Sequence, residues 1–171
     1  MRDTVEFSEL SETQLAYIFP RLREYDRQEL EIFGYTDENA WEQIQHCDQA
    51  ICGILNNEPV CVFGYSLTPT TMRFGFFGTD KVERYWKRIT KGAQSYLKYQ
   101  MQQHPSHRPV IEVWEQHTQS RRWLKLLGFE ESSTYRTTSK GRTIFLHFNK
   151  YNKARSDHKC ATSQQPQQLS A

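Results

Sequence analysis

The sequence predicts an α+β domain, in which a sheet is covered by amphipathic helices. Short apolar runs typical of strands occur in several places, and longer segments with apolar residues at helical spacing lie before and between them. A polar turn at residues 56–59 joins two of the apolar runs into a predicted hairpin. The length of 171 residues fits one domain. We therefore expect one domain over residues 1–148.

The N-terminal part of the chain begins with a predicted strand and a helix. Residues 4–7 alternate polar and apolar side chains, as in a half-buried strand. Ser11 stands where an N-cap residue would start a helix over residues 11–19.

Pro20 interrupts the helical pattern that begins at Ser11. Because proline breaks or kinks a helix, we expect a second helical piece over residues 21–33, which Gly34 ends. The apolar residues of this piece are expected to face the core: Leu22, Tyr25, Leu30 and Phe33.

The middle of the chain changes from a helical to a strand pattern. A short helix is predicted over residues 37–45, with the hydroxyl of Thr36 as its cap. Apolar runs over residues 50–56, 60–67 and 71–78 are too short for helices, and turn residues separate them. They predict three antiparallel strands.

A long helix is predicted next, followed by a final group of strands. Asp80 is the expected N-cap of a helix over residues 81–103, whose aromatic and aliphatic stripe predicts packing on the sheet rather than base stacking. A strand over 109–114 precedes a helix over 118–129.

Gly128 is expected to end that last helix in a left-handed conformation. Residues 129–137 and 142–148 predict a final hairpin, and residues 149–171 predict a disordered, polar, Gln-rich tail.

Composition excludes several classes of protein. The net charge of +2 provides no strong field for nucleic acid, so nucleic-acid binding is expected at most weakly, through the basic start of the tail. The four cysteines form no C-x-x-C pair, and no histidines stand at zinc-finger spacing, so we expect no metal site and no disulfide framework. No segment approaches the roughly 20 apolar residues of a membrane helix, and no membrane partner is expected.

The predicted order of elements and the segment TQSRRWLKLLGF resemble the GNAT superfamily of N-acetyltransferases. Residues that match the pattern of the family's last helix are Ser120, Trp123, Leu127, Gly128 and Phe129. The resemblance implies a GNAT-like central mixed, mostly antiparallel sheet flanked by helices, and, in active members, acetyl-CoA as cofactor.

Two positions depart from that pattern. His117 stands where the family commonly has Asn, and Leu124 stands where active members often carry a general-acid Tyr. The resemblance therefore implies that the chain keeps the GNAT fold but lacks the general-acid side chain of active members.

The same segment, together with GTD at residues 78–80, resembles a family of GNAT-like internal core proteins of short-tailed phages. That resemblance implies a non-catalytic virion-associated protein of the internal core, portal or tail region, which acts in assembly or genome ejection. Phage structural proteins would be its partners. The protein would be found in the virion, and in the host cytoplasm during assembly.

The cofactor loop of GNAT enzymes is degenerate in this chain. Such enzymes cradle the acetyl-CoA pyrophosphate with Q/R-x-x-G-x-G/A, where glycines let backbone N–H groups approach the phosphates. Here only Gly78, Thr79, Asp80 and Lys81 lie between the strand and the helix. Because a capping Asp80 would use those N–H groups and oppose an anion, we expect no bound cofactor, or acetyl-CoA if the chain is an enzyme.

Candidate catalytic residues follow the strand over residues 109–114. Glu112, or Glu115 just after it, could act as general base for an amine, and His117 as a proton shuttle. The alternative is that Glu112 faces solvent or pairs with Arg121 or Arg122.

Other reactive side chains indicate chemistry less clearly. His104 and His107 flank a proline loop without nearby ligands at regular spacing. Cys47 and Cys52 have no His, Asn or Asp constellation around them in sequence, so buried free thiols are expected. Three functions therefore stay open. The first is a non-catalytic phage protein that acts by protein contacts, and the second is an acetyl-CoA-dependent N-acetyltransferase with a degenerate cofactor loop. The third and weakest is a DNA-binding module that acts through the tail.

Overall fold

The computed structural model describes residues 5–137 and 144–150, and it confirms the predicted α+β class. Its seven-stranded sheet has the order β1-β2-β3-β4-β5-β7-β6. The β4–β5 pair is parallel, and the other neighbouring pairs are antiparallel. The strands are β1 Val5–Glu9, β2 Gln49–Leu55, β3 Glu58–Leu67, β4 Thr71–Gly78, β5 Arg108–Trp114, β6 Glu130–Thr137 and β7 Ile144–Asn149.

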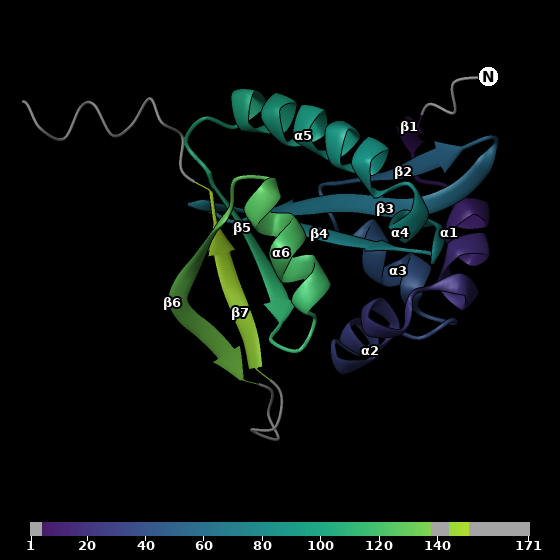
Figure 1. Cartoon of the computed structure of the whole chain (residues 1–171), viewed down its shortest axis with the longest axis horizontal. Coiled ribbons are helices and arrows are strands. Elements are labelled where there is room, and N and C mark those ends of the chain that lie inside the picture. Colours follow the sequence, from purple (N-terminus) through teal and green to yellow (C-terminus); the bar gives the residue numbers. More distant parts are fainter. Residues whose placement is uncertain (1–4, 138–143, 151–171) are drawn as a thin grey trace, which may run out of the picture.

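Helices cover both faces of the sheet (Figure 1). They are α1 Glu12–Ile18, the 3₁₀ turn η1 Phe19–Arg21, α2 Glu24–Ile32, α3 Ala40–Gln45, α4 Lys81–Arg84, α5 Trp86–Gln103 and α6 Thr118–Leu126. Among the described residues, no helix is both long and apolar enough to cross a lipid bilayer.

Two hydrophobic clusters hold the layers together. Val62 and Phe63 are consecutive on β3 and so point to opposite faces of the sheet. Phe63 belongs to the cluster that α5 and α6 form with the sheet, through buried residues such as Ile89 and Leu124. Val62 belongs to the cluster formed with α1 and α3. The apolar stripe of α5 therefore packs on the sheet as predicted, except at Trp86, which is 44% exposed.

The chain breaks at Pro20 as predicted, because η1 separates α1 from α2. Ser11 caps α1 in a full capping box with Gln14. Leu22 is buried, but Tyr25 is 45% exposed and Phe33 is 38% exposed, so the expectation that both face the core was wrong. The buried residue of α2 is Asp26, whose carboxylate takes the inward position.

The predicted helix over residues 81–103 is broken at Tyr85. Tyr85 has φ −109° and ψ 19°, and its carbonyl accepts hydrogen bonds from both Arg88 and Ile89. No glycine or proline marks the break, so the apolar pattern could not reveal it. The expected cap was also wrong: Asp80 makes no side-chain cap bond, because its backbone is already helical, at φ −55° and ψ −22°.

The predicted turn residues adopt the conformations that turns require. Asn56 and Asn57 have positive φ, which is typical of a two-residue hairpin. Gly34 and Gly128 both have φ +84°, so both helix ends are left-handed as predicted. Thr36 accepts a hydrogen bond from the N–H of Asn39, so it caps the turn that precedes α3.

The last strands are only partly described. The centre of the predicted final hairpin and residues 151–171 of the predicted tail lie outside the described residues. Asn149 is the last residue of β7, and Lys150 donates a hydrogen bond to the carbonyl of Leu127.

One feature of the sheet positions the candidate site. The parallel register of β4 with β5 covers residues 71–74 against 108–111 only. Both strands continue beyond this register, β4 to Gly78 and β5 to Trp114. The two strands are therefore unpaired with each other at their C-terminal ends, where α2 and α6 approach.

Candidate functional site

Two cavities meet where β4 and β5 separate. One, of about 370 Å³, is lined by residues of α2 and α3 and by both strands. The other, of about 580 Å³, lies between α4, α5 and α6. Both are lined by Phe76, Ser120 and Trp123. The rings of Phe76 and Trp123 lie 4.6 Å apart between centroids and form a shared wall.

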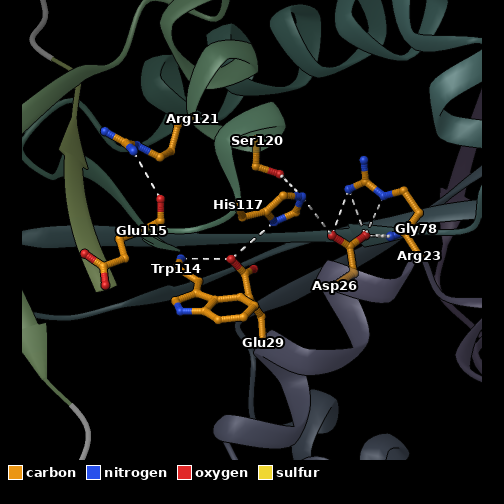
Figure 2. A network of polar contacts seen from close by, with 9 residues as sticks. All are labelled: Arg23, Asp26, Glu29, Gly78, Trp114, Glu115, His117, Ser120 and Arg121. Atoms are coloured by element: carbon orange, nitrogen blue, oxygen red, sulfur yellow. Dashed lines mark hydrogen bonds and ion pairs between the residues drawn. The ribbon is translucent and has the colours of Figure 1, made fainter. Parts of the chain in front are cut away.

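A buried ion pair closes the end of β4. The guanidinium of Arg23 donates to both carboxylate oxygens of Asp26 at 2.8–2.9 Å, and the two residues are 7% and 1% exposed. Asp26 also accepts a hydrogen bond from the N–H of Gly78 at 2.8 Å, and Arg23 N–H donates to the Gly78 carbonyl at 3.0 Å. Both backbone groups of Gly78 are therefore bonded to the chain itself, and Figure 2 shows the bond between its N–H and Asp26.

His117 lies beside this pair and connects α2 to α6 (Figure 2). Its Nδ1 is 3.2 Å from Oε1 of Glu29, and its Nε2 is 2.9 Å from Oγ of Ser120. Glu29 also accepts a hydrogen bond from the N–H of Trp114 at 2.8 Å. The ring of Tyr25 stacks on the imidazole at 5.1 Å between centroids, which fixes the plane of the ring.

Charge in this network is compensated within a small volume. Burial raises the pKa of the Asp26 carboxyl above its ordinary value, and the neighbouring Arg23 guanidinium and His117 ring oppose that rise. Nε2 of His117 is 3.9 Å from Oδ1 of Asp26. The imidazole thus lies between the Asp26 and Glu29 carboxylates.

Asp26, Glu29 and His117 offer ligand atoms within 4.8 Å of one another. This spacing could suit a metal ion, but the Arg23 guanidinium occupies both oxygens of Asp26 and would repel a cation. The arrangement of these side chains is therefore better explained by the Arg23–Asp26 ion pair than by a metal site.

The structure places Glu112 on β5 in the 370 Å³ cavity. Its carboxylate pairs with Arg73 at 2.8 Å, Arg136 at 2.9 Å and His147 at 3.1 Å. The expected pairing with Arg121 or Arg122 was wrong, because β4, β6 and β7 bring Arg73, Arg136 and His147 to Glu112 instead. Both carboxylate oxygens of Glu112 are therefore engaged by side chains of the chain itself.

Glu115 contributes its backbone rather than its carboxylate. Its carbonyl accepts a hydrogen bond from Arg121 at 3.1 Å, which holds the loop before α6. Arg121 pairs with Glu131 at 3.3 Å.

The residues of the degenerate loop have structural roles. A Cβ added at Gly78 would lie 2.4 Å from Cγ2 of Val82 and 2.9 Å from the Val60 carbonyl, so close packing requires glycine there. Thr79 donates from its N–H and its hydroxyl to the same Val60 carbonyl, at 2.9 and 3.3 Å. The Asp80 carboxylate makes no capping hydrogen bond with the N–H groups at the start of α4, in contrast to the prediction.

Of the other reactive side chains, His104, His107 and Cys52 line neither cavity. His104 and His107 lie together, with ring centroids 5.8 Å apart, and His104 Nε2 is 3.3 Å from the hydroxyl of Tyr65. Cys52 is a buried free thiol as expected, whereas Cys47 is half-buried in the wall of the 370 Å³ cavity.

Sequence reasoning missed Arg23, Asp26, Glu29 and the hydroxyl of Ser120. A signal for two of them exists, because Asp26 and Glu29 fall on the helix face marked by Leu22, Leu30 and Phe33. A carboxylate on an otherwise apolar face indicates a buried partner.

Solved structures show which fold this site belongs to. The chain is similar to a GNAT-family acetyltransferase from Bacillus anthracis, with a TM-score of 0.65 and 16% identity over 87% of this chain and 97% of that one. It is also similar to the ribosomal-protein-S18-alanine N-acetyltransferase of Escherichia coli, with a TM-score of 0.63 and 14% identity over 86% and 93%. Ard1 from Thermoplasma volcanium gives a TM-score of 0.64 and 14% identity over 87% and 99%. The GNAT fold is thereby confirmed.

Neither a protein-family sequence model nor a curated protein sequence matches the chain.

Proposed function

We propose that this protein is an acyltransferase that takes an acyl group from a thioester of the acetyl-CoA type and transfers it to an amine. The observation that carries the proposal is the meeting of two cavities at Phe76, Ser120 and Trp123, where β4 and β5 separate. A donor in one cavity and an acceptor in the other would both lie against these three side chains. The acetyltransferases with the same fold support this proposal.

The cavity between α5 and α6 fits the acyl-pantetheine arm of such a donor. Its wall is largely apolar, with Val82, Trp86, Ile89, Trp123 and Leu126. A narrow chain bearing an acyl group would bury apolar surface against these residues. The thioester supplies an activated acyl group, and the chain supplies the walls that orient it and exclude water.

The phosphates of such a donor would have to be held by side chains. Gly78 has no free backbone N–H for them, because Asp26 accepts it. Arg122 lines the same cavity and has no ion-pair partner within residues 5–137 and 144–150. We propose that Arg122 takes part of the role that a glycine loop has elsewhere.

Binding of acetyl-CoA tests this proposal directly. Isothermal titration calorimetry and thermal shift should show saturable binding, which Arg122→Glu weakens about tenfold or more through loss of a charge-assisted contact. Lys98→Glu is the matched control, because Lys98 is exposed on α5 and does not line the cavity. Absence of saturable binding at millimolar acetyl-CoA would contradict the proposal.

The second candidate is a virion protein that acts through contacts, as the phage resemblance implies. The C-terminal end of β4 favours this candidate, because the N–H and the carbonyl of Gly78 are already bonded to Asp26 and Arg23 and are not free to bind a cofactor phosphate. Trp86, Tyr99 and Tyr135 are 44%, 57% and 61% exposed and would be natural anchors for a portal, tail or internal core protein.

Quantitative mass spectrometry of purified phage particles and proheads tests this candidate. Copurification with assembled particles at a fixed ratio is the expected result. Its absence from both, with free protein in the infected cytoplasm, would remove the candidate.

A further inference from the structure

We propose that Ser120 is an activated nucleophile, with His117 as its base and Glu29 as the residue that orients the base, and that it accepts an acyl group from an ester or thioester. The inference goes beyond acyl transfer from acetyl-CoA, because any activated ester that enters either cavity could react.

The distances match those of a nucleophile, its base and an orienting carboxylate. Oγ of Ser120 is 2.9 Å from Nε2 of His117, and Nδ1 of His117 is 3.2 Å from Oε1 of Glu29. A carboxylate at Nδ1 favours the tautomer with its proton there, which leaves Nε2 free to accept the serine proton. The three side chains come from α2, α6 and the residue before α6, so the fold alone brings them together.

The base is fixed before any ligand arrives. His117 is 1% exposed, and Tyr25 stacks on its ring at an interplanar angle of 17°. Glu29 is fixed by the Trp114 N–H at 2.8 Å. A positively charged imidazole would lie between Glu29 and Asp26, whose Oδ1 is 3.9 Å from Nε2. The Glu29 carboxylate at Nδ1 therefore stabilises the protonated base that the reaction creates, while the Asp26 carboxylate is already paired with Arg23.

The nucleophile, unlike the base, is open to ligands. Ser120 is half-buried and lines both cavities, so a substrate in either cavity would lie beside it. Ser120 also lies in the first turn of α6, where the N–H groups of Gln119 and Ser120 lack intrahelical acceptors and could meet a developing oxyanion.

The proposed step conserves atoms and charge. Oγ of Ser120 bonds to the acyl carbon while its proton moves to Nε2 of His117. The carbon–oxygen or carbon–sulfur bond of the donor then breaks, and the leaving alcohol or thiol takes that proton. Water or an amine releases the acyl group by the same path, giving its proton to His117 and restoring the serine.

A fluorophosphonate probe tests the inference without any CoA. The phosphorus–fluorine bond breaks as Oγ attacks, so the folded wild-type protein should gain one phosphonyl group, which peptide mass spectrometry maps to Ser120. Ser120→Ala should remain unlabelled. Ser95→Ala should be labelled like the wild type, because Ser95 is exposed on α5 and its hydroxyl donates to the Lys91 carbonyl.

Glu29→Gln tests the role of the orienting carboxylate. It keeps a hydrogen-bond acceptor but removes the charge, so labelling should slow about tenfold or more, while the melting temperature, measured in parallel, shows whether the fold is kept. No adduct on folded wild-type protein, or an adduct that persists in Ser120→Ala, would overturn the inference. Labelling of Ser120 at an unchanged rate in folded Glu29→Gln would overturn the role of Glu29. Since the probe needs no cofactor, failure here is distinguishable from failure of acetyl-CoA binding.

Discussion

The carboxylate of Asp26 accepts a hydrogen bond from the N–H of Gly78 at 2.8 Å and so joins α2 to the last residue of β4. Arg23 completes the connection from the same helix end, since it binds both Asp26 and the Gly78 carbonyl. The end of β4 is thus held by charged groups rather than by β5. This explains why the strands can separate without leaving the backbone of Gly78 unpaired.

Removal of the Asp26 carboxylate should destabilise the domain strongly. Asp26→Ala leaves the buried Arg23 guanidinium and the Gly78 N–H without their acceptor, so we expect a loss of about 3–5 kcal/mol in the free energy of unfolding. Urea denaturation measures it. Glu24→Ala, an exposed position on the same helix, is the control and should change stability by less than about 0.5 kcal/mol. Equal effects of the two changes would refute the role of the buried pair.

A side chain at Gly128 should strain the end of α6. Gly128 has φ +84°, and an added Cβ would also lie 3.1 Å from Nζ of Lys150. We expect Gly128→Val to cost about 1–3 kcal/mol, because β-branched residues rarely adopt this conformation. Thermal denaturation should show no comparable loss for Gly75→Val, where a Cβ meets no atom within 4 Å. Equal stability of both variants would contradict the prediction.

Neutralisation of Glu112 should affect stability slightly and acyl transfer hardly at all. Its partners Arg73 and Arg136 have side chains 51% and 46% exposed, so their ion pairs are screened by water. We expect Glu112→Gln to cost about 1 kcal/mol or less. Steady-state kinetics with acetyl-CoA and an amine should change less than about threefold, since we propose His117 rather than the paired carboxylate as the base. A loss of activity of about a hundredfold with stability unchanged would instead identify Glu112 as the base.

Cysteine reactivity should follow burial. Burial raises the pKa of Cys52 to about 11. Because the thiolate is the reactive form and a raised pKa lowers its fraction, on the order of one thiol in a thousand is ionised at pH 8. Alkylation of native protein at pH 8, followed by peptide mass spectrometry, should modify half-buried Cys47 and spare Cys52. Reactivity of Cys52 should rise as the pH approaches 11, and modification of both thiols at equal rates at pH 8 would contradict this.

The sequence by itself determined the order of elements, because their signals are local. Pro20 broke the first helical pattern, Asn56 and Asn57 marked the hairpin, and Gly34 and Gly128 marked helix ends. The motif around Trp123 predicted the GNAT fold that the solved structures confirm. Each of these signals depends on the conformational preference of one or two residues.

Only the tertiary structure decided the site. Glu29 and His117 are 88 positions apart in the chain, and Asp26 and Gly78 are 52 apart. Their contacts depend on how α2 and α6 pack at the separation of β4 and β5, which no local pattern encodes. The break at Tyr85 and the pairing of Glu112 with Arg73, Arg136 and His147 were likewise set by packing between elements distant in sequence. Periodicity in the sequence shows which face of a helix or strand is apolar. It does not show which residues pair with a buried charged side chain, because those partners lie on other elements that only the fold brings close.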